Sequence, residues 1–156
     1  VISSDTSGKL IASNTALKNN IKSWLMQYRM INDTVDILDS PIINFGINYQ
    51  VRVDDSTNRY TVVNRANNRL SSYYASRRFD IGENIAITDI YRELLKVKGV
   101  IDIVSLEVVA KQGGVYSESN YNFRANTSSD GNQILSPPTT IFELKFPNAD
   151  IKGSII

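Results

Sequence analysis

The chain has 156 residues, of which 42% are hydrophobic and 21% charged, and its 17 basic and 16 acidic side chains leave a formal charge of +1. This size and composition are typical of one globular domain, and the charge balance gives no general attraction to nucleic acid or membranes. The chain has no cysteine and no histidine. Disulfides and thiol nucleophiles are therefore excluded, and the commonest general base and metal ligand is missing.

The N-terminal stretch indicates how the chain is divided. Residues 1–12 mix small polar residues with Leu10 and Ile11, which predicts a linker or arm from a preceding domain. Residues 13–156 are expected to form a single α+β domain. Because the chain opens on Val1 rather than on methionine, we interpret it as a C-terminal fragment of a longer protein. No apolar run approaches the roughly 20 residues that cross a bilayer, so we expect no membrane association.

A first helix is predicted after residue 12, with Ser13 or Asn14 as its N-terminal cap. Its apolar residues recur at helical spacing, and we expect that face to be buried, with Trp24 as a packing anchor rather than a partner contact. The residues of this face are Leu17, Ile21, Trp24, Leu25 and Tyr28.

Three aspartates, Asp33, Asp36 and Asp39, follow this helix at spacings of three. Oxygen ligands at close spacing invite a metal interpretation. Apolar residues alternate with them and no Gly-centred binding loop accompanies them. We therefore favour an extended segment with its aspartates in water and expect no metal site.

Residues 43–53 carry the clearest pattern in the chain. Every second residue is large and apolar, and polar residues or glycine lie between them. Such alternation predicts a long strand with one buried and one solvated face. The apolar positions are Ile43, Phe45, Ile47, Tyr49, Val51 and Val53. We expect the other elements to cover or extend that face.

A turn is predicted over residues 54–58, followed by a second amphipathic helix over residues 60–77. Five arginines accompany its polar side, with tyrosines nearby. Arginine and tyrosine are enriched in protein interfaces, and they also serve nucleic-acid binding by contacting phosphates and stacking on bases. The arginines are Arg59, Arg65, Arg69, Arg77 and Arg78.

A third helix is predicted from a cap at Thr88, with Gly99 at its C-terminal end. A strand follows at once. Simple alternation places one set of its residues on a shared face, namely Val100, Asp102, Val104, Leu106 and Val108.

The last third of the chain is more polar. Residues 115–136 predict a mobile hairpin or a functional loop, reversing at Asp130-Gly131. Residues 140–146 predict a strand, and residues 149–156 a polar turn with a short apolar tail. Overall we expect an α+β fold with about three helices packed on one face of a small mixed or antiparallel sheet.

Motifs for chemistry are missing. The sequence has no glycine-rich phosphate loop and no nucleophile elbow. We therefore predict no enzyme activity, no catalytic residues, no cofactor and no metal. A hydrolase acting through scattered carboxylates such as Glu83 and Glu93 is the least favoured alternative.

Three stretches together resemble a known family. They are Leu17–Val53, which contains Trp24-Leu25-Met26-Gln27-Tyr28-Arg29-Met30; Ile87–Leu106, which contains Val97-Lys98-Gly99-Val100; and Phe142–Gly153, which contains Phe146-Pro147-Asn148-Ala149-Asp150. In this order they resemble the C-terminal part of the baseplate wedge subunit of T-even-type contractile-tailed phages, in the baseplate-J-like group.

The resemblance implies a structural protein of the virion tail baseplate that is assembled in the host cytoplasm. Its implied partners are a second copy, as a homodimer of the full-length protein, and other wedge and hub proteins. Such subunits join into a ring around the hub and transmit the rearrangement that accompanies sheath contraction. We predict interface residues on the arginine-rich helix and the polar loop, namely Arg59, Arg65, Arg69, Tyr73, Arg77, Arg78, Tyr116 and Tyr121. The alternative is a nucleic-acid-binding domain that uses the same helix face.

Overall fold

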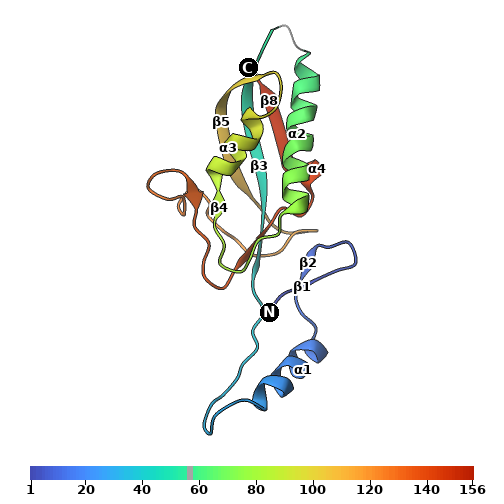
Figure 1. The fold of residues 1–156 in the computed structure, drawn as a ribbon, viewed down its shortest axis with the longest axis vertical. Coiled ribbons are helices and arrows are strands. Elements are labelled where there is room, and N and C mark those ends of the chain that lie inside the picture. The colour runs from blue at the N-terminus through green and yellow to red at the C-terminus, as the bar shows by residue number, and fades with distance from the viewer. Residues whose placement is uncertain (56–57) are drawn as a thin grey trace.

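The computed structural model describes residues 1–55 and 58–156. These residues form an α+β fold around a four-stranded mixed sheet, as the sequence predicted (Figure 1). The elements are β1 (Ser3–Ser4), β2 (Leu10–Ile11), α1 (Thr15–Met26), β3 (Ile42–Val53), α2 (Arg59–Ser76), β4 (Ile85–Ala86), α3 (Ile87–Leu95), β5 (Val100–Lys111), β6 (Gln133–Ile134), β7 (Ile141–Glu143), α4 (Pro147–Asp150) and β8 (Ile151–Ile155). Ser56 and Thr57 of the expected turn lie outside the described residues.

Strand β3 is the centre of the sheet. It pairs antiparallel with β5 along one edge, and parallel with β7 and then β8 along the other. All six apolar positions of its predicted face are buried. The predicted strand and its buried face are therefore confirmed, whereas the other face is exposed only at Arg52, because Asn44 and Gly46 are buried as well.

Two irregularities in β5 overturn its predicted face. Opposite Gln50 and Val51 the register moves from Ser105 to Ile103, and opposite Arg52 and Val53 it moves from Asp102 to Val100. Each step inserts an extra residue on β5, which is the geometry of a β-bulge. The core-facing set is therefore Val100, Ile103, Leu106 and Val108, while Asp102 and Val104 are exposed.

The C-terminal part of the sheet also differs from the prediction. The expected strand over residues 140–146 is only the three-residue β7, and residues 144–146 form an irregular link to the short helix α4, which Pro147 opens. The expected polar turn and tail is strand β8, which pairs with β3 from Ile47 to Val51. Two short parallel strands thus share one edge of β3.

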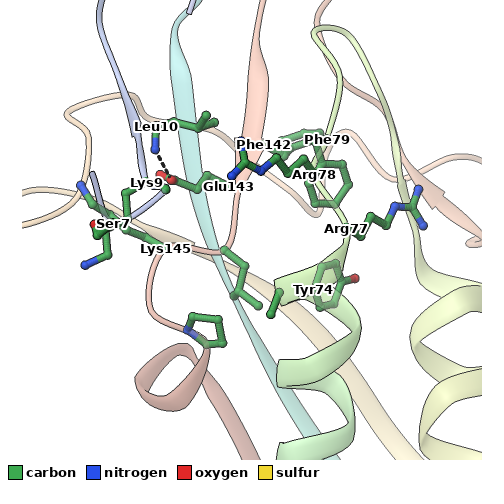
Figure 2. A pocket seen from close by; sticks show the side chains of 14 residues that line it. Ser7, Lys9, Leu10, Tyr74, Arg77, Arg78, Phe79, Phe142, Glu143 and Lys145 are labelled. Carbon is green, nitrogen blue, oxygen red and sulfur yellow. Dashed lines mark hydrogen bonds between the residues drawn. The ribbon is translucent and has the colours of Figure 1, made fainter. Parts of the chain in front are cut away.

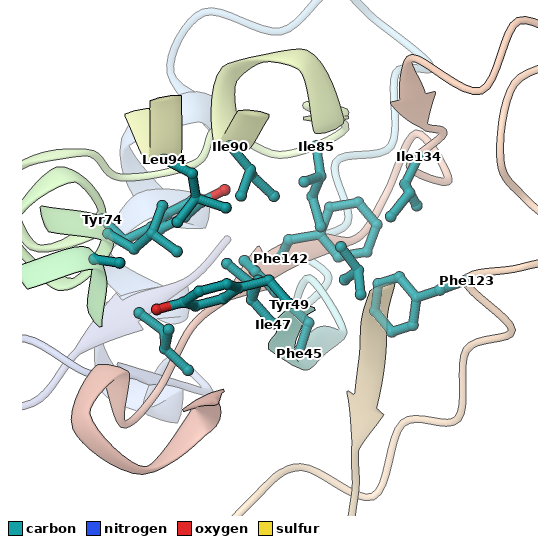
Figure 3. Packing of buried hydrophobic residues seen from close by; sticks show 14 of the residues in the cluster. Phe45, Ile47, Tyr49, Tyr74, Ile85, Ile90, Leu94, Phe123, Ile134 and Phe142 are labelled. Carbon is teal, nitrogen blue, oxygen red and sulfur yellow. The ribbon is translucent and has the colours of Figure 1, made fainter. Parts of the chain in front are cut away.

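Helices α2 and α3 cover the apolar face of the sheet (Figure 1). Val62, Ala66 and Leu70 of α2 and Ile90 and Leu94 of α3 are fully buried. Figure 3 shows these helices packing around rings from the strands and the loop after β5. Helix α3 begins one residue before the predicted cap Thr88, and its cap residue Ala86 offers no side-chain hydrogen bond.

Helix α1 forms where predicted, and the side chain of Asn14 caps it by accepting from the Leu17 N–H. Its predicted packing is wrong, because no residue of α1 is buried and Trp24 is 58% exposed. Figure 1 shows the helix lying away from the sheet, at the end of a separate excursion of the chain.

The long loop between β5 and β7 is anchored to the core. Phe123 and Ile134 are buried, and β6 pairs with β4 beside the start of α3. The reversal at Asp130-Gly131 forms as predicted, with a hydrogen bond from Gly131 N to Ser128 O of 2.9 Å.

Candidate interaction surfaces

Two of the predicted interface arginines are engaged within the chain. Arg69 Nε lies 2.7 Å from Oε2 of Glu93, and Lys96 Nζ lies 2.6 Å from Oε1 of the same carboxylate. Hydrogen bonds from Lys96 and Arg69 lower the pKa of Glu93 despite its burial. Glu93 therefore links α3 to α2 as a structural carboxylate.

Arg77 is the centre of a second network. Its guanidinium lies 2.6 Å from Oε1 of Glu83 and 3.0 Å from Oδ2 of Asp89, and it donates to the hydroxyl of Tyr73 at 2.6 Å. The hydrogen bond with Glu83 is the main reason that the pKa of Arg77 is raised. The Tyr73 hydroxyl donates in turn to Asp89, so this tyrosine fixes α2 to α3 rather than facing a partner.

The other three predicted arginines are free enough of intramolecular contacts to bind a partner. Arg59 makes a 3.4 Å ion pair with Asp55, and both side chains are largely exposed. Arg65 and Arg78 are exposed and make no ion pair within the described residues. The arginines of the second helix thus divide into a structural pair and three that can contact a partner.

The two predicted loop tyrosines have intramolecular roles. Tyr116 donates a 2.6 Å hydrogen bond to Oδ1 of buried Asp150, and this bond raises the pKa of Tyr116 to about 12. The Tyr121 hydroxyl bonds to the carbonyl of Leu135, and its ring packs against Phe123 and Phe142. Both rings hold the loop in place.

A surface that sequence reasoning missed lies on residues 13–40, which we call the α1 lobe. Its base is tied to the N-terminal segment: the Val1 amino group donates to Leu38 O at 2.7 Å, and Ser40 N donates to Val1 O at 2.9 Å. Ser40 Oγ also bonds to Thr139 O at 2.7 Å. The lobe therefore leaves and rejoins the body of the protein at one place.

Beyond this base the α1 lobe presents apolar side chains to solvent. The rings of Trp24 and Tyr28 contact each other at a tilt of 53°, with centroids 5.0 Å apart, and Tyr28 is 71% exposed. Ile31 is 94% exposed. Clustered exposed apolar side chains mark interaction sites more often than isolated ones do. The exposed apolar residues of the lobe are Leu17, Trp24, Met26, Tyr28, Met30, Ile31 and Leu38.

Polar contacts inside the lobe explain the aspartates noted in the sequence. Asp39 pairs with Lys18 at 2.6 Å, and Asp36 pairs with Lys22 at 3.4 Å. Asp33 accepts a hydrogen bond from Met30 N. The two ion pairs join the return segment to α1, and within the described ranges no group of three acidic side chains is placed to hold a metal ion.

Glu83 and Glu93, the carboxylates of the hydrolase alternative, are also held by hydrogen bonds and ion pairs within the chain. Burial raises the pKa of Glu83, but hydrogen bonds from Asp80 N and Arg77 outweigh it, so the pKa is lowered overall. Glu93 is held by Arg69 and Lys96. Among the described residues, every buried side-chain nitrogen and oxygen has a hydrogen-bond partner.

No helix among the described residues has the length and apolar character needed to cross a membrane.

No protein-family model matches this chain, and no curated protein sequence matches it. The resemblance to baseplate wedge subunits therefore rests on the three sequence stretches given above. The class that the structure defines is an α+β domain with an exposed apolar lobe.

Proposed function

We propose that this chain is a structural assembly module of a contractile phage tail baseplate. In this proposal it joins neighbouring subunits of a wedge ring around the hub and transmits the rearrangement for sheath contraction, without enzyme activity. The observation that supports assembly most directly is the exposed apolar surface of the α1 lobe. The sequence resemblance supplies the baseplate setting.

The physical argument starts from α1 itself. A 12-residue helix is marginal in water, and most helical stability in proteins comes from burying an apolar face. Yet α1 buries no residue, and it has neither an acidic side chain in its first turn nor a basic one in its last. Covering a large apolar side chain contributes about 1.5–3 kcal/mol. A partner that covers Trp24, Tyr28 and Ile31 would therefore stabilise the lobe.

The composition of the lobe also fits a protein partner. Tryptophan, tyrosine and methionine are enriched in protein interfaces, and tryptophan and tyrosine are also enriched among the residues that dominate binding energy. The nucleic-acid alternative gains less support, since Arg69 and Arg77 are neutralised by carboxylates from α3 and the segment before it.

The test is sedimentation equilibrium over a range of chain concentrations, at low and high salt. We expect a dimer or larger species that persists at high salt, because an apolar interface is not screened. The Trp24→Ala/Tyr28→Ala variant should shift this equilibrium toward monomer while retaining its fold, since neither ring is buried.

A matched control is Tyr60→Ala, which removes an 82% exposed ring from α2 outside the lobe. This variant should associate like the parent chain. A parent that stays monomeric at every concentration, or a lobe variant that associates as well as Tyr60→Ala, would contradict self-association through the α1 lobe.

A further inference from the structure

A pocket of about 370 Å³ lies away from the α1 lobe surface, where three segments meet. Figure 2 shows its walls: the loop between β1 and β2, the C-terminal end of α2, and the segment that joins β7 to α4. This volume is at the small end of the range for ligand sites, which suits one or two side chains of a peptide.

The rim of the pocket carries three cations that make no ion pair among the described residues, although Asp5, in the loop beside it, attracts Lys9 at longer range. Lys9, Arg78 and Lys145 all line it, and none makes an ion pair within the part of the chain that the structure describes. Lys9 and Lys145 are half-buried. A half-buried ammonium gains more from an anion than a fully exposed one does, because the local dielectric is lower. The other lining cation, Arg77, is occupied by Glu83 and Asp89.

One carboxylate, Glu143, lines the pocket, and its oxygens are already used. Oε1 accepts from Leu10 N at 2.6 Å, and Oε2 accepts from Asn44 Nδ2 at 2.8 Å. Glu143 therefore joins β2 to the central sheet, and it leaves an excess of positive charge at the rim.

The inner wall of the pocket is apolar. Phe79 and Phe142 pack edge-to-face with centroids 6.3 Å apart, and Leu144 lies beside them in the lining. Lys9 Nζ lies 4.1 Å from the centroid of Phe146, so the aromatic ring helps to hold this cation at the rim. An apolar wall with cations around it suits a ligand that joins an apolar group to anionic groups.

The adjoining loop offers no backbone cradle for a phosphate. Phosphate sites in glycine-rich loops and at helix N-termini use unpaired backbone N–H groups. In the adjoining loop, Ser7 N and Lys9 N donate to Oδ1 of Asp5, and Gly8 N donates to Asp5 O. The next N–H, from Leu10, is taken by Glu143.

We propose that this pocket binds an acidic peptide segment of a partner protein, in which carboxylates flank an apolar side chain. The apolar side chain contacts Phe79 and Leu144, and the carboxylates pair with Lys9, Arg78 and Lys145. The site goes beyond the proposed assembly function, since it uses none of the apolar residues of the α1 lobe. A negative result for the peptide site would not contradict assembly through the α1 lobe, and the reverse also holds.

The probe is a fluorescein-labelled synthetic peptide with the sequence of residues 33–40, in which aspartates surround Ile37 and Leu38. Fluorescence anisotropy on the full chain should show saturable binding. The same peptide with asparagine at its three aspartate positions should bind at least about tenfold more weakly.

Charge reversal locates the site. Lys9→Glu/Lys145→Glu should weaken binding at least about tenfold. The matched control Lys98→Glu/Lys152→Glu changes the net charge equally at two exposed lysines outside the pocket, and should bind like the parent. Lys9→Met/Lys145→Met, which keeps the apolar stems, should also lose binding and separates a charge effect from misfolding.

Three results would overturn the proposal: no saturable binding at low salt, equal binding of the asparagine peptide, or equal effects of the pocket and control reversals. Displacement of the peptide by inorganic pyrophosphate at matched concentration would also overturn it, because the pocket would then be a phosphate site.

Discussion

The ring of Tyr49 lies over Gly153, its neighbour on the parallel strand β8. A Cβ added at Gly153 would overlap the Tyr49 hydroxyl and Cζ and would lie 2.8 Å from Cε2. The Tyr49 side chain reaches α2, where its hydroxyl donates a hydrogen bond to Oδ1 of Asn67 at 2.8 Å. One side chain of the central strand thus joins β8 to a helix, and it requires a glycine beneath it.

Gly153→Ala should therefore destabilise the protein by about 1–3 kcal/mol, the usual cost of overpacking. Urea unfolding followed by circular dichroism measures this change. The control Lys152→Ala alters the preceding, exposed position of β8 and should change stability by less than about 0.5 kcal/mol.

A double-mutant cycle identifies the cause. Replacing Tyr49 by Leu removes the atoms that the new Cβ meets, so Gly153→Ala should cost less in that background than in the parent chain. Equal costs in both backgrounds would show that the ring is not the reason for the glycine.

The sequence predicted elements whose pattern is local. The alternation over residues 43–53 and the helical stripe with Val62, Ala66 and Leu70 both appear in the structure with the expected faces buried. Strand β8 was missed because its sequence, Ile-Lys-Gly-Ser-Ile, is short and has a glycine at its centre. Gly153 is needed because the Tyr49 ring lies over it, and this contact between two strands cannot be seen in a local sequence pattern.

The other sequence predictions that were wrong also depend on contacts between residues far apart in the chain. Alternation alone cannot show the bulges of β5, which depend on the register with β3. The apolar stripe of α1 has the spacing of a buried helix face, yet Trp24 is exposed because the chain carries the helix away from the sheet. The pocket was not predicted because Lys9, Arg78 and Lys145 are brought together only by the fold.

Phe45 is the largest fully buried side chain of β3, and it contacts four aromatic rings. Phe45→Ala should cost about 3–5 kcal/mol, because the cavity left among these rings cannot close completely. Val104→Ala, at an exposed bulge position on β5, is the control and should cost far less. Urea unfolding compares the two, and a loss below about 1 kcal/mol for Phe45→Ala would contradict the packing shown in Figure 3.

Glu93 should make the protein sensitive to acid. Hydrogen bonds from Lys96 and Arg69 lower its pKa below the ordinary value of 4.5. The folded state therefore holds this carboxylate ionised more strongly than the unfolded chain does. The resulting stabilisation is present above pH 4.5 and is lost as the pH falls through the lower folded-state pKa.

Glu93→Gln should consequently reduce stability at pH 7 and flatten the fall in stability below pH 4.5. Unfolding free energies measured by urea titration from pH 7 to pH 3 test this. Glu107→Gln removes the same charge from an exposed site on β5 without an ion pair among the described residues, and it serves as the control. Parallel curves for the parent chain and Glu93→Gln would count against the role of Glu93.

The long loop after β5 depends on Phe123 as its anchor. This ring is 5% exposed and packs against Tyr121 and Phe142, whereas the next residue, Arg124, is exposed. Trypsin needs a locally opened chain, and each loss of about 1.4 kcal/mol in local stability raises the open population tenfold. Phe123→Ala should therefore speed cleavage after Arg124 by roughly tenfold or more under native conditions.

Mass spectrometry of the early fragments measures this rate, and global unfolding of the same variant is measured in parallel. Leu135→Ala, which removes an exposed side chain from the same loop, should leave the rate unchanged. Cleavage after Arg124 that rises only as much as global unfolding predicts would mean that the loop does not open independently. A rise beyond that value would show that Phe123 holds a separately opening unit on the core.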